Sequence, residues 1–373
     1  MCWHTCVHQT RKLNVRCWQV DEHQLSKILS SIRPLNAEAM NAARERVNRL
    51  TKPLGSLGML EEIAIQVAGI TGNPTPSTQK KAVVVFAADH RVTRQGVSLY
   101  PKEVTAQMVL NFVKGGAAIS VLSKHCGARL LVVDVGVAAD LPEHDGLLIR
   151  KVAWGTGDIS CEPAMTMRQA LDAISVGVEA VKMLVEDGAQ IIAIGDMGIG
   201  NTTPSSAITA VLTGKQAREV TGRGTGLDDE RYMHKVAVVE AALNFHRPDP
   251  NDPLDVLSKV GGLEIAALVG AVIACGLMRI PVIVDGFITT AAAAIAFSMQ
   301  PLLKDYMFAG HISPEPGHRV LLDFIGLRPI LSLNMRLGEG TGAVLAMHII
   351  DAACQLLSRM ATFDEAGVSG PIL

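Results

Sequence analysis

The chain has 373 residues, a formal net charge of −2 at pH 7, 49% hydrophobic residues and only 4% aromatic ones. A chain of this length can form one large α/β domain and a smaller unit. The near-neutral charge provides no broad field for nucleic acid or for an acidic membrane surface, so neither is expected as a partner. An anionic substrate must therefore be held by a few local groups.

The cysteines and the apolar runs predict a cytoplasmic protein. Seven cysteines are scattered without the spacing of a disulfide framework, which indicates reduced thiols. The first 20 residues lack the apolar centre of a secretory signal. The longest apolar run, residues 265–278, is shorter than the ~20 residues of a membrane-spanning helix. We expect it to be a buried core helix.

In chain order, apolar residues at helical spacing predict helices on both sides of Pro34, the second over residues 36–50, and another over 60–70. Turn-forming residues at 71–77 mark a domain boundary. Short apolar runs then predict strands at 82–88, 129–135, 190–194, 280–285 and 306–310. Helical patterns follow at 103–113, 167–187, 228–244, 262–277 and 341–360.

This alternation of strands and helices predicts an α/β fold with a doubly wound parallel sheet. In such folds, ligands bind beyond the carboxyl ends of the strands. The residues that directly follow each predicted strand are therefore the first candidates for a functional site.

A glycine-rich segment follows the strand at 190–194 and leads into a helix. Gly198 and Gly200 allow close approach of the backbone to a ligand, and the amides that open the helix can face an anion. Asn201, Thr202 and Thr203 add side-chain donors. An ordinary strand-to-helix turn is the alternative, but the two adjacent threonines favour a phosphate site.

A second glycine-containing loop begins at Arg223. Thr225 is a possible donor to phosphate or ribose, and Asp228 or Asp229 is expected to cap the next helix. A simple capped turn fits these residues equally well. Lys235 lies within two turns of that helix, where a surface lysine is the plain interpretation.

Polar residues after three strands raise the alternative of a metal site. Asp89 and His90 follow one strand and Asp285 follows another, while His311, Glu315 and His318 cluster after a third. Carboxylates and imidazoles are metal ligands, but no pair has the spacing of a known zinc or iron motif. We therefore expect no metal, and we expect these groups to tie loops together.

Glu339 stands between Gly338 and Gly340 at the start of an apolar helix. The carboxylate fits an N-terminal helix charge. If it faces a cleft, apolar walls would raise its pKa and suit it to act as a general base. The residues alone leave both interpretations open.

Eight sequence blocks, in order over residues 35–369, resemble the nicotinate-nucleotide:dimethylbenzimidazole phosphoribosyltransferase family, which acts in synthesis of the lower ligand of cobalamin. The blocks are LTKPLGSLG at 50–58, AADH at 87–90 with QGVS at 95–98 and YPKEVT at 100–105, MGIGNTT at 197–203, RGTG at 223–226, VGGLEIA at 260–266, VDGFIT at 284–289, EPGH at 315–318 and RLGEGTG at 336–342.

The resemblance implies a Rossmann-like catalytic domain over residues 76–344 and a small helical domain from both chain ends, residues 21–75 and 345–373. Residues 1–20 have no family counterpart and are expected to be a disordered extension without a metal role for Cys2, His4, Cys6 and His8. The family implies a homodimer and no cofactor. Its reaction transfers phosphoribose from nicotinate mononucleotide to a benzimidazole-type base, which gives α-ribazole phosphate and nicotinate.

The resemblance also implies roles for individual residues. Glu339 corresponds to the catalytic base. Residues assigned to phosphate or ribose are Gly198, Gly200, Asn201, Thr202, Thr203, Lys235 and Asp196. Residues assigned to the benzimidazole pocket are Ser98, Tyr100, Gln107 and Leu337. Residues assigned to nicotinate or ribose are Glu315, Gly317 and His318.

Two positions differ from the family. Asp196 stands where the family has glutamate, and Arg91 stands where it has glycine. A glycine at a loop position often serves a left-handed backbone, in which another residue costs about 1 kcal/mol. We expect a rearranged loop, with Arg91→Gly raising stability; the alternative is that Arg91 pairs with a substrate anion. A non-catalytic sensor of nucleotide or azole and a metal hydrolase are the rival functions.

Overall fold

The computed structural model describes residues 21–369. A 7-stranded parallel sheet runs through the body in the order β3-β2-β1-β4-β5-β6-β7. The strands are β1 (Lys81–Ala88), β2 (Ala128–Gly136), β3 (Leu147–Ile149), β4 (Ile191–Met197), β5 (Val282–Val284), β6 (Met307–His311) and β7 (Pro329–Leu331). This order confirms the predicted doubly wound sheet. All strands are parallel, and the order in which the chain adds them to the sheet changes side between β1 and β4.

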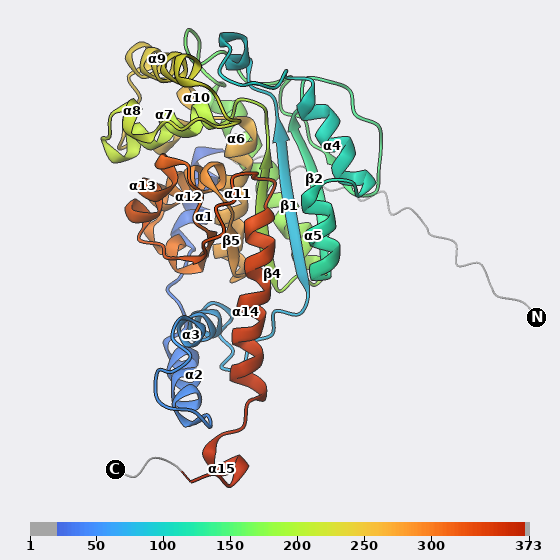
Figure 1. Cartoon of the computed structure of the whole chain (residues 1–373), viewed down its shortest axis with the longest axis vertical. Helices are drawn as coiled ribbons and strands as arrows, with labels where there is room; N and C mark the ends of the chain where they lie inside the picture. Colours follow the sequence, from blue (N-terminus) through green and yellow to red (C-terminus); the bar gives the residue numbers. More distant parts are fainter. Residues whose placement is uncertain (1–20, 370–373) are drawn as a thin grey trace, which may run out of the picture.

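Each face of the sheet is covered by helices, as the apolar strands require. One face carries α6 (Met167–Glu186), α11 (Leu263–Met278) and α12 (Phe287–Met299). The other carries α4 (Val104–Lys114), α5 (Ala118–Cys126) and α14 (Thr341–Arg359), and α14 crosses in front of the strands in Figure 1. Strands β1 and β4 are therefore buried on both sides.

Helices α6 and α11 cross with their backbones in contact. A Cβ atom on Gly177 of α6 would lie 1.9 Å from the carbonyl oxygen of Ala267, and one on Gly270 of α11 would lie 2.0 Å from that of Ile174. Both distances are far below van der Waals contact, so only glycine allows this crossing. The crossing also places the amino end of α11 beside the carboxyl ends of β1 and β2.

The remaining helices of the body connect the strands and the covering helices. They are α7 (Thr202–Thr213), α8 (Ala217–Val220), α9 (Asp229–His246), α10 (Pro253–Val260) and α13 (Pro316–Ile325), with the 3-10 helices η1 (Arg91–Gln95) and η2 (Pro301–Tyr306). Figure 1 shows α7, α8, α9 and α10 grouped at the upper left, beside one end of the sheet. Of these four helices, α7 reaches the region where the fold predicts a ligand, through its first residue, Thr202.

A helical unit extends from the opposite end of the body (Figure 1). It contains α2 (Ala37–Arg49), α3 (Met59–Thr71), the C-terminal half of α14 and α15 (Phe363–Ala366). Arg46 and Arg49 of α2 pair with Glu365 and Asp364, which attaches the C-terminal segment. Both chain ends thus contribute to the same helical unit.

Helix α1 (Glu22–Ser30) differs from the expected division, because it packs on α11 of the body. Ile32 lies over Gly276 of α11, and Gln300 donates a hydrogen bond to the carbonyl of Leu29. The reason is that α1 has its own apolar stripe, which α11 covers. The small helical unit therefore begins after Pro34.

By length and hydropathy alone, Val104–Cys126 and Thr341–Arg359 would be long enough to cross a membrane. The first is two helices, α4 and α5, interrupted at Gly115 in a left-handed conformation. The second is α14, which packs against α3, α5 and the sheet. Both belong to the helical covering of the sheet, although the sequence pattern had singled out only α11 as an apolar core helix.

Candidate active site

A cavity of about 610 Å³ opens at the carboxyl ends of β4, β5 and β6, beside the point where the strand order reverses. Its walls come from six segments that are far apart in sequence. The lining residues include Ser98 and Tyr100, Asp196 to Thr202, Thr225, Phe287, His311, Glu315, and Arg336 to Glu339. The position is the one that the doubly wound fold favours for a ligand.

The glycine-rich turn after β4 forms one side of this cavity. The amides of Asn201 and Thr203 donate to the carbonyls of Gly198 and Gly200, and the amide of Ile199 donates to the Thr105 hydroxyl over 3.1 Å. Within residues 21–369, the amides of Gly200 and Thr202 have no protein acceptor. These two N–H groups at the start of α7 are thus available to an anion.

Lys235 lies directly behind this turn and does not line the cavity. Its side chain is fully buried, and its Nζ donates to the Thr202 hydroxyl over 2.7 Å and to the Gly222 carbonyl over 3.3 Å. Burial lowers the pKa of Lys235 to about 8, opposed by the charge of Glu315. The surface position that helical spacing alone suggested for Lys235 is therefore wrong.

Glu339 lines the cavity from the loop that precedes α14. The side chain is buried, and its Oε2 accepts a hydrogen bond of 3.3 Å from the amide of Ile119 at the start of α5. Burial raises the pKa of Glu339, the Ile119 amide opposes this, and the charge of Asp285 adds to it. A carboxylate with a raised pKa at a cavity wall is suited to accept a proton.

Asp196 at the end of β4 also lines the cavity. Its Oδ2 accepts a hydrogen bond from Asn201, while its buried Oδ1 has no partner among the described residues. Burial, followed by the charge of Asp285, raises the pKa of Asp196 to about 7. Near neutral pH both forms of this carboxyl group are therefore populated, and its free oxygen can meet a ligand hydroxyl.

The opposite wall is more apolar and more open. Tyr100 and Leu337 are more than half exposed at the cavity mouth, and Val104 and Met108 of α4 lie deeper. Ser98 completes this side. Gln107 does not line the cavity, because it faces solvent from another side of α4.

The loop at 315–318 contributes only its first residue to the cavity. Glu315 accepts a hydrogen bond from the Gly224 amide, and its buried Oε2 has no partner in the described part of the chain. Gly317 packs against Phe287. His318 is buried and bound on both ring nitrogens, by the Ser313 amide and the Thr290 hydroxyl, and burial lowers its pKa to about 3.

Thr203 is another assigned residue that the structure keeps from the cavity. Its side chain is fully buried inside the first turn of α7.

The structure also adds a residue that sequence reasoning missed. Arg336 is the one lysine or arginine between residues 21 and 369 that lines the cavity, and its Nη1 contacts the Gly224 carbonyl over 3.3 Å. Its position in the RLGEGTG block was the available signal.

The groups considered for a metal do not converge. His90 pairs with Glu264 over 2.6 Å beneath the glycine turn, while the rings of His311 and His318 lie 6.0 Å apart between centroids. Among residues 21–369 there is no group of three or more His, Cys, Asp or Glu side chains placed to hold a metal ion. Cys2, His4, Cys6 and His8 lie outside the described residues.

Arg91 begins η1 with a backbone outside the left-handed region, so the strain expected at this position is absent. Its side chain is about half exposed and lies 3.8 Å from Glu162, and it does not line the cavity. Because there is no strained conformation to relieve, the expected gain of stability in Arg91→Gly loses its physical basis.

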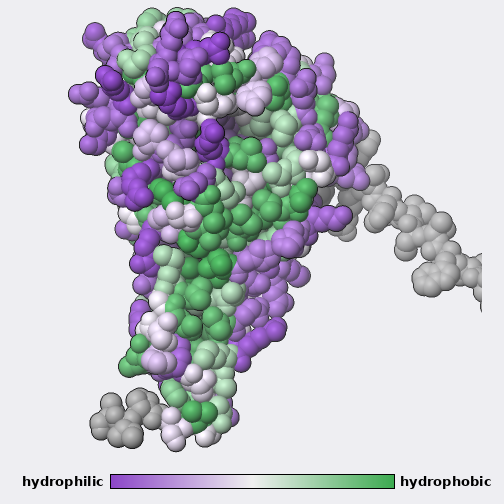
Figure 2. Space-filling model, viewed as in Figure 1, coloured by the Kyte–Doolittle hydropathy of each residue, from purple (hydrophilic) through white to green (hydrophobic). Residues whose placement is uncertain are grey.

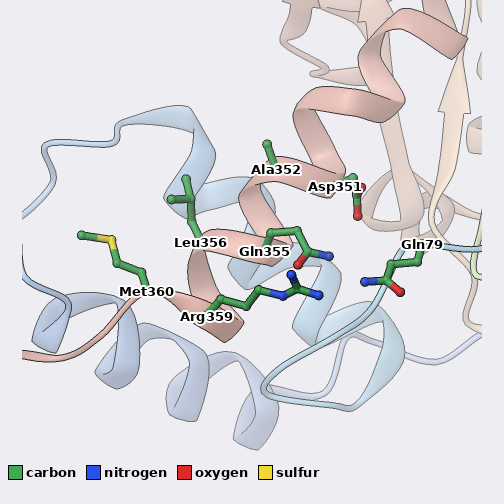
Figure 3. Close-up of a pocket in the computed structure, with 7 residues that line it drawn as sticks. All are labelled: Gln79, Asp351, Ala352, Gln355, Leu356, Arg359 and Met360. Carbon is green, nitrogen blue, oxygen red and sulfur yellow. The ribbon is translucent and has the colours of Figure 1, made fainter. Parts of the chain in front are cut away.

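A second, more open hollow lies at the other end of the sheet (Figure 3). Gln355 and Arg359 of α14 face it together with Gln79. The nearby Asp351 is already bound by Lys81 and Thr78, at 3.0 Å from each. This hollow lies at the amino ends of the strands, where the fold does not favour a ligand.

Comparison with known proteins decides the family. The family model described as phosphoribosyltransferase matches residues 32–368. The nicotinate-nucleotide–dimethylbenzimidazole phosphoribosyltransferase of Chloroflexus aggregans is 55% identical over 92% of this chain and 98% of its own length. The chain belongs to this phosphoribosyltransferase family.

Further members agree in sequence and fold. The relative of the same name from Geobacter sulfurreducens is 52% identical over 92% of this chain and 98% of its own length. The crystal structure of CobT from Thermus thermophilus matches with a TM-score of 0.86 and 48% identity, over 89% of this chain and 99% of that one. The chain is thus an enzyme of this phosphoribosyltransferase family, which decides against the non-catalytic sensor and the metal hydrolase.

Proposed function

We propose that this enzyme transfers the phosphoribosyl group of nicotinate mononucleotide to dimethylbenzimidazole or a related base, giving α-ribazole phosphate and nicotinate. The names of its relatives support these substrates. The observation that carries the proposal is that two helix-start amides without an acceptor in residues 21–369, suited to an anion, line the same cavity as a buried carboxylate with a raised pKa. Phosphoribosyl transfer to an azole requires both.

The nucleotide phosphate binds at the glycine turn in this proposal. The unpartnered amides of Gly200 and Thr202 donate to its oxygens, and the dipole of α7 adds to the attraction. Asn201 and the Thr202 hydroxyl lie beside them. Lys235 acts through Thr202, because its Nζ approaches the hydroxyl from behind and orients it toward the cavity.

Two carboxylates are placed to hold the ribose. Asp196 and Glu315 each carry a buried oxygen without a partner in residues 21–369, and both residues line the cavity. Ribose hydroxyls are donors that satisfy such oxygens. Gly317 and His318 support this loop from behind without contact to the substrate.

The acceptor base lies between Tyr100, Leu337 and the apolar side of α4, with Ser98 at its edge. Its nitrogen attacks C1′ of the ribose from the face opposite nicotinate, so the β-nucleotide gives an α-product. Glu339 takes the proton from the other azole nitrogen. The pyridinium of the donor is already cationic and leaves as neutral-ring nicotinate without an acid, so one base is sufficient, and positioning contributes most of the remaining rate.

The test is incubation of the purified enzyme with nicotinate mononucleotide and dimethylbenzimidazole, with and without a chelator. We expect α-ribazole phosphate and nicotinate to form in a one-to-one ratio, and the chelator to leave the amount of product unchanged. Binding of both substrates without product would contradict the proposal, and so would release of nicotinate by water when no base is present.

We also propose that the enzyme is a cytoplasmic homodimer. Figure 2 shows a band of hydrophobic surface along α14 and toward α5. Apolar side chains at least partly exposed on these helices include Val121, Leu345 and Ile349, and Val121 is 58% exposed. Light scattering should give twice the chain mass, and Val121→Glu should shift the protein to monomer.

The cysteines support the cytoplasm as the compartment. The described cysteines Cys126, Cys161, Cys275 and Cys354 are free thiols, as expected in a reducing compartment, and cell fractionation tests this.

A further inference from the structure

Helix α14 begins without a capping side chain of its own. Its N-cap is Gly340, which has no side chain to accept the first free amides. Asp285, which follows β5, supplies the cap from another part of the chain. Its Oδ1 accepts from the Ala343 amide over 2.8 Å, and its Oδ2 accepts from the Gly340 amide over 3.2 Å.

The turn that this cap holds has an unusual backbone. Gly338, Glu339 and Gly340 are left-handed in succession, with φ values of 82°, 64° and 92°. The two glycines adopt this conformation freely, whereas Glu339 in it costs about 1 kcal/mol. The turn also packs tightly on β4, because a Cβ on Gly195 would lie 2.3 Å from the Glu339 carbonyl oxygen. A strained residue persists only where its surroundings hold it.

We propose that Asp285 is a positioning residue for Glu339: its two hydrogen bonds hold the left-handed turn that aims the Glu339 carboxylate into the cavity. The inference rests on the proposed role of Glu339 as the general base. Asp285 itself does not line the cavity and is fully buried, so it acts on the reaction through the turn. A carboxylate is needed there because one group must accept two backbone amides.

The surroundings of Asp285 fit this role. The ring Nε2 of His311, on β6, lies 3.7 Å from its Oδ1, and Asp196 on β4 and Glu339 on the turn are the neighbouring acids. Keeping Asp285 ionised beside these acids costs free energy, since burial raises its pKa. The amides at the start of α14, with their helix dipole, offset that cost.

The first test is Asp285→Asn, measured by steady-state kinetics at saturating and limiting concentrations of each substrate. Asparagine keeps one acceptor oxygen and replaces the other with a donor, so one of the two amides loses its acceptor. We expect kcat to fall tenfold or more while both KM values stay within about twofold. A fall carried by KM, with kcat unchanged, would overturn the proposal.

Asp134→Asn is the matched control. Asp134 is also fully buried, lies near the carboxyl end of β2, and accepts from a backbone amide, that of Val137, over 2.8 Å, with Lys151 as its ion-pair partner. It does not line the cavity, so its variant should lose stability while keeping kcat. An equal loss of kcat in both variants would show that Asp285 acts only through general stability. If Asp285→Asn does not fold, Asp285→Ser, which also cannot accept both amides, takes its place.

A double-mutant cycle with Glu339→Gln separates this inference from the proposed function. If Glu339→Gln alone keeps wild-type turnover, the proposed base is wrong, whatever Asp285 does. If Glu339→Gln is impaired and Asp285→Asn adds little to that loss, Asp285 acts through Glu339, as proposed. The same fold-loss from Asp285→Asn in both backgrounds would overturn the inference and leave the role of Glu339 intact.

Discussion

The Nζ of Lys235 and the hydroxyl of Thr202 are 2.7 Å apart, in a contact that joins the fully buried side chain of α9 to the first residue of α7. The contact places a cation behind the proposed phosphate site without exposing it to solvent. A buried ammonium is costly, and this cost gives a measurable dependence of stability on pH.

The first prediction follows from the lowered pKa of Lys235, about 8 in the folded chain against roughly 10.4 when unfolded. Below pH 8 both states are protonated and the full burial cost is present. Between pH 8 and 10 only the folded state has lost its proton, so stability should rise relative to Lys235→Met, by an amount on the order of a few kcal/mol. Denaturant unfolding of both proteins from pH 7 to 10 measures this, and a constant difference would contradict it.

The second prediction concerns Glu339→Gln, which should lower kcat by roughly a hundredfold or more, as for a lost general base, with little change in KM. The pKa of Glu339 is raised, so wild-type activity should fall as the pH drops through that pKa, and the variant should lack this acid limb. The matched control is Glu240→Gln on the exposed side of α9, which should behave as wild type. A variant with an unchanged pH profile would remove Glu339 from the mechanism.

The third prediction compares two glycines at opposite ends of α7. Gly200 and Gly214 are both left-handed, but a Cβ on Gly200 would meet Thr93 at 2.8 Å while Gly214 faces open space. Gly200→Ala should therefore raise the KM for nicotinate mononucleotide roughly tenfold or more and leave that for the base nearly unchanged. Gly214→Ala should lose only the stability that a left-handed alanine costs and should leave both KM values unchanged. Equal KM changes for both substrates in Gly200→Ala would count against a phosphate site.

The fourth prediction is that Arg91→Gly gives no gain in stability. Arg91 has ordinary helical backbone geometry in η1, where glycine costs roughly 0.5–1 kcal/mol through its greater freedom in the unfolded chain. A thermal melt should show an equal or slightly lower Tm, with kinetics unchanged. A rise in KM for the nucleotide would instead assign Arg91 to substrate binding.

The sheet could be predicted from sequence because its central strands are continuous apolar runs buried on both faces. The edge strands β3 and β7 could not, since each has three residues that are only partly buried, whereas the equally short β5 is fully buried within a longer apolar run. Gln107 shows the limit within a predicted helix. Val104 and Met108 are one turn apart and face the cavity, whereas Gln107 lies on another face, and only packing decides which face turns inward.

The candidate site, like the sheet, could be predicted only in part from the sequence. Motif blocks indicate Glu339 and the glycine turn, because both depend on residue types that are adjacent in sequence. The cap from Asp285 to Gly340 and the support of Ile199 by Thr105 join residues that are far apart along the chain, so no local pattern announces them. The burial of Lys235 has the same origin, since Thr202 of α7 and the loop at residues 222–224 contact it only in the folded chain.

The glycine crossing of α6 and α11 has a consequence for how mutations spread through this enzyme. Helix α11 carries Glu264 in its first turn, and Glu264 holds His90 directly beneath Gly198 of the glycine turn. A methyl group at Gly177 would displace α11. Because α11 is closely packed along its length, we expect it to move as a unit, and the ion pair between Glu264 and His90 would carry that displacement to Gly198. In a saturation screen for activity, Gly177 and Gly270 should therefore stand among the intolerant positions although neither lines the cavity.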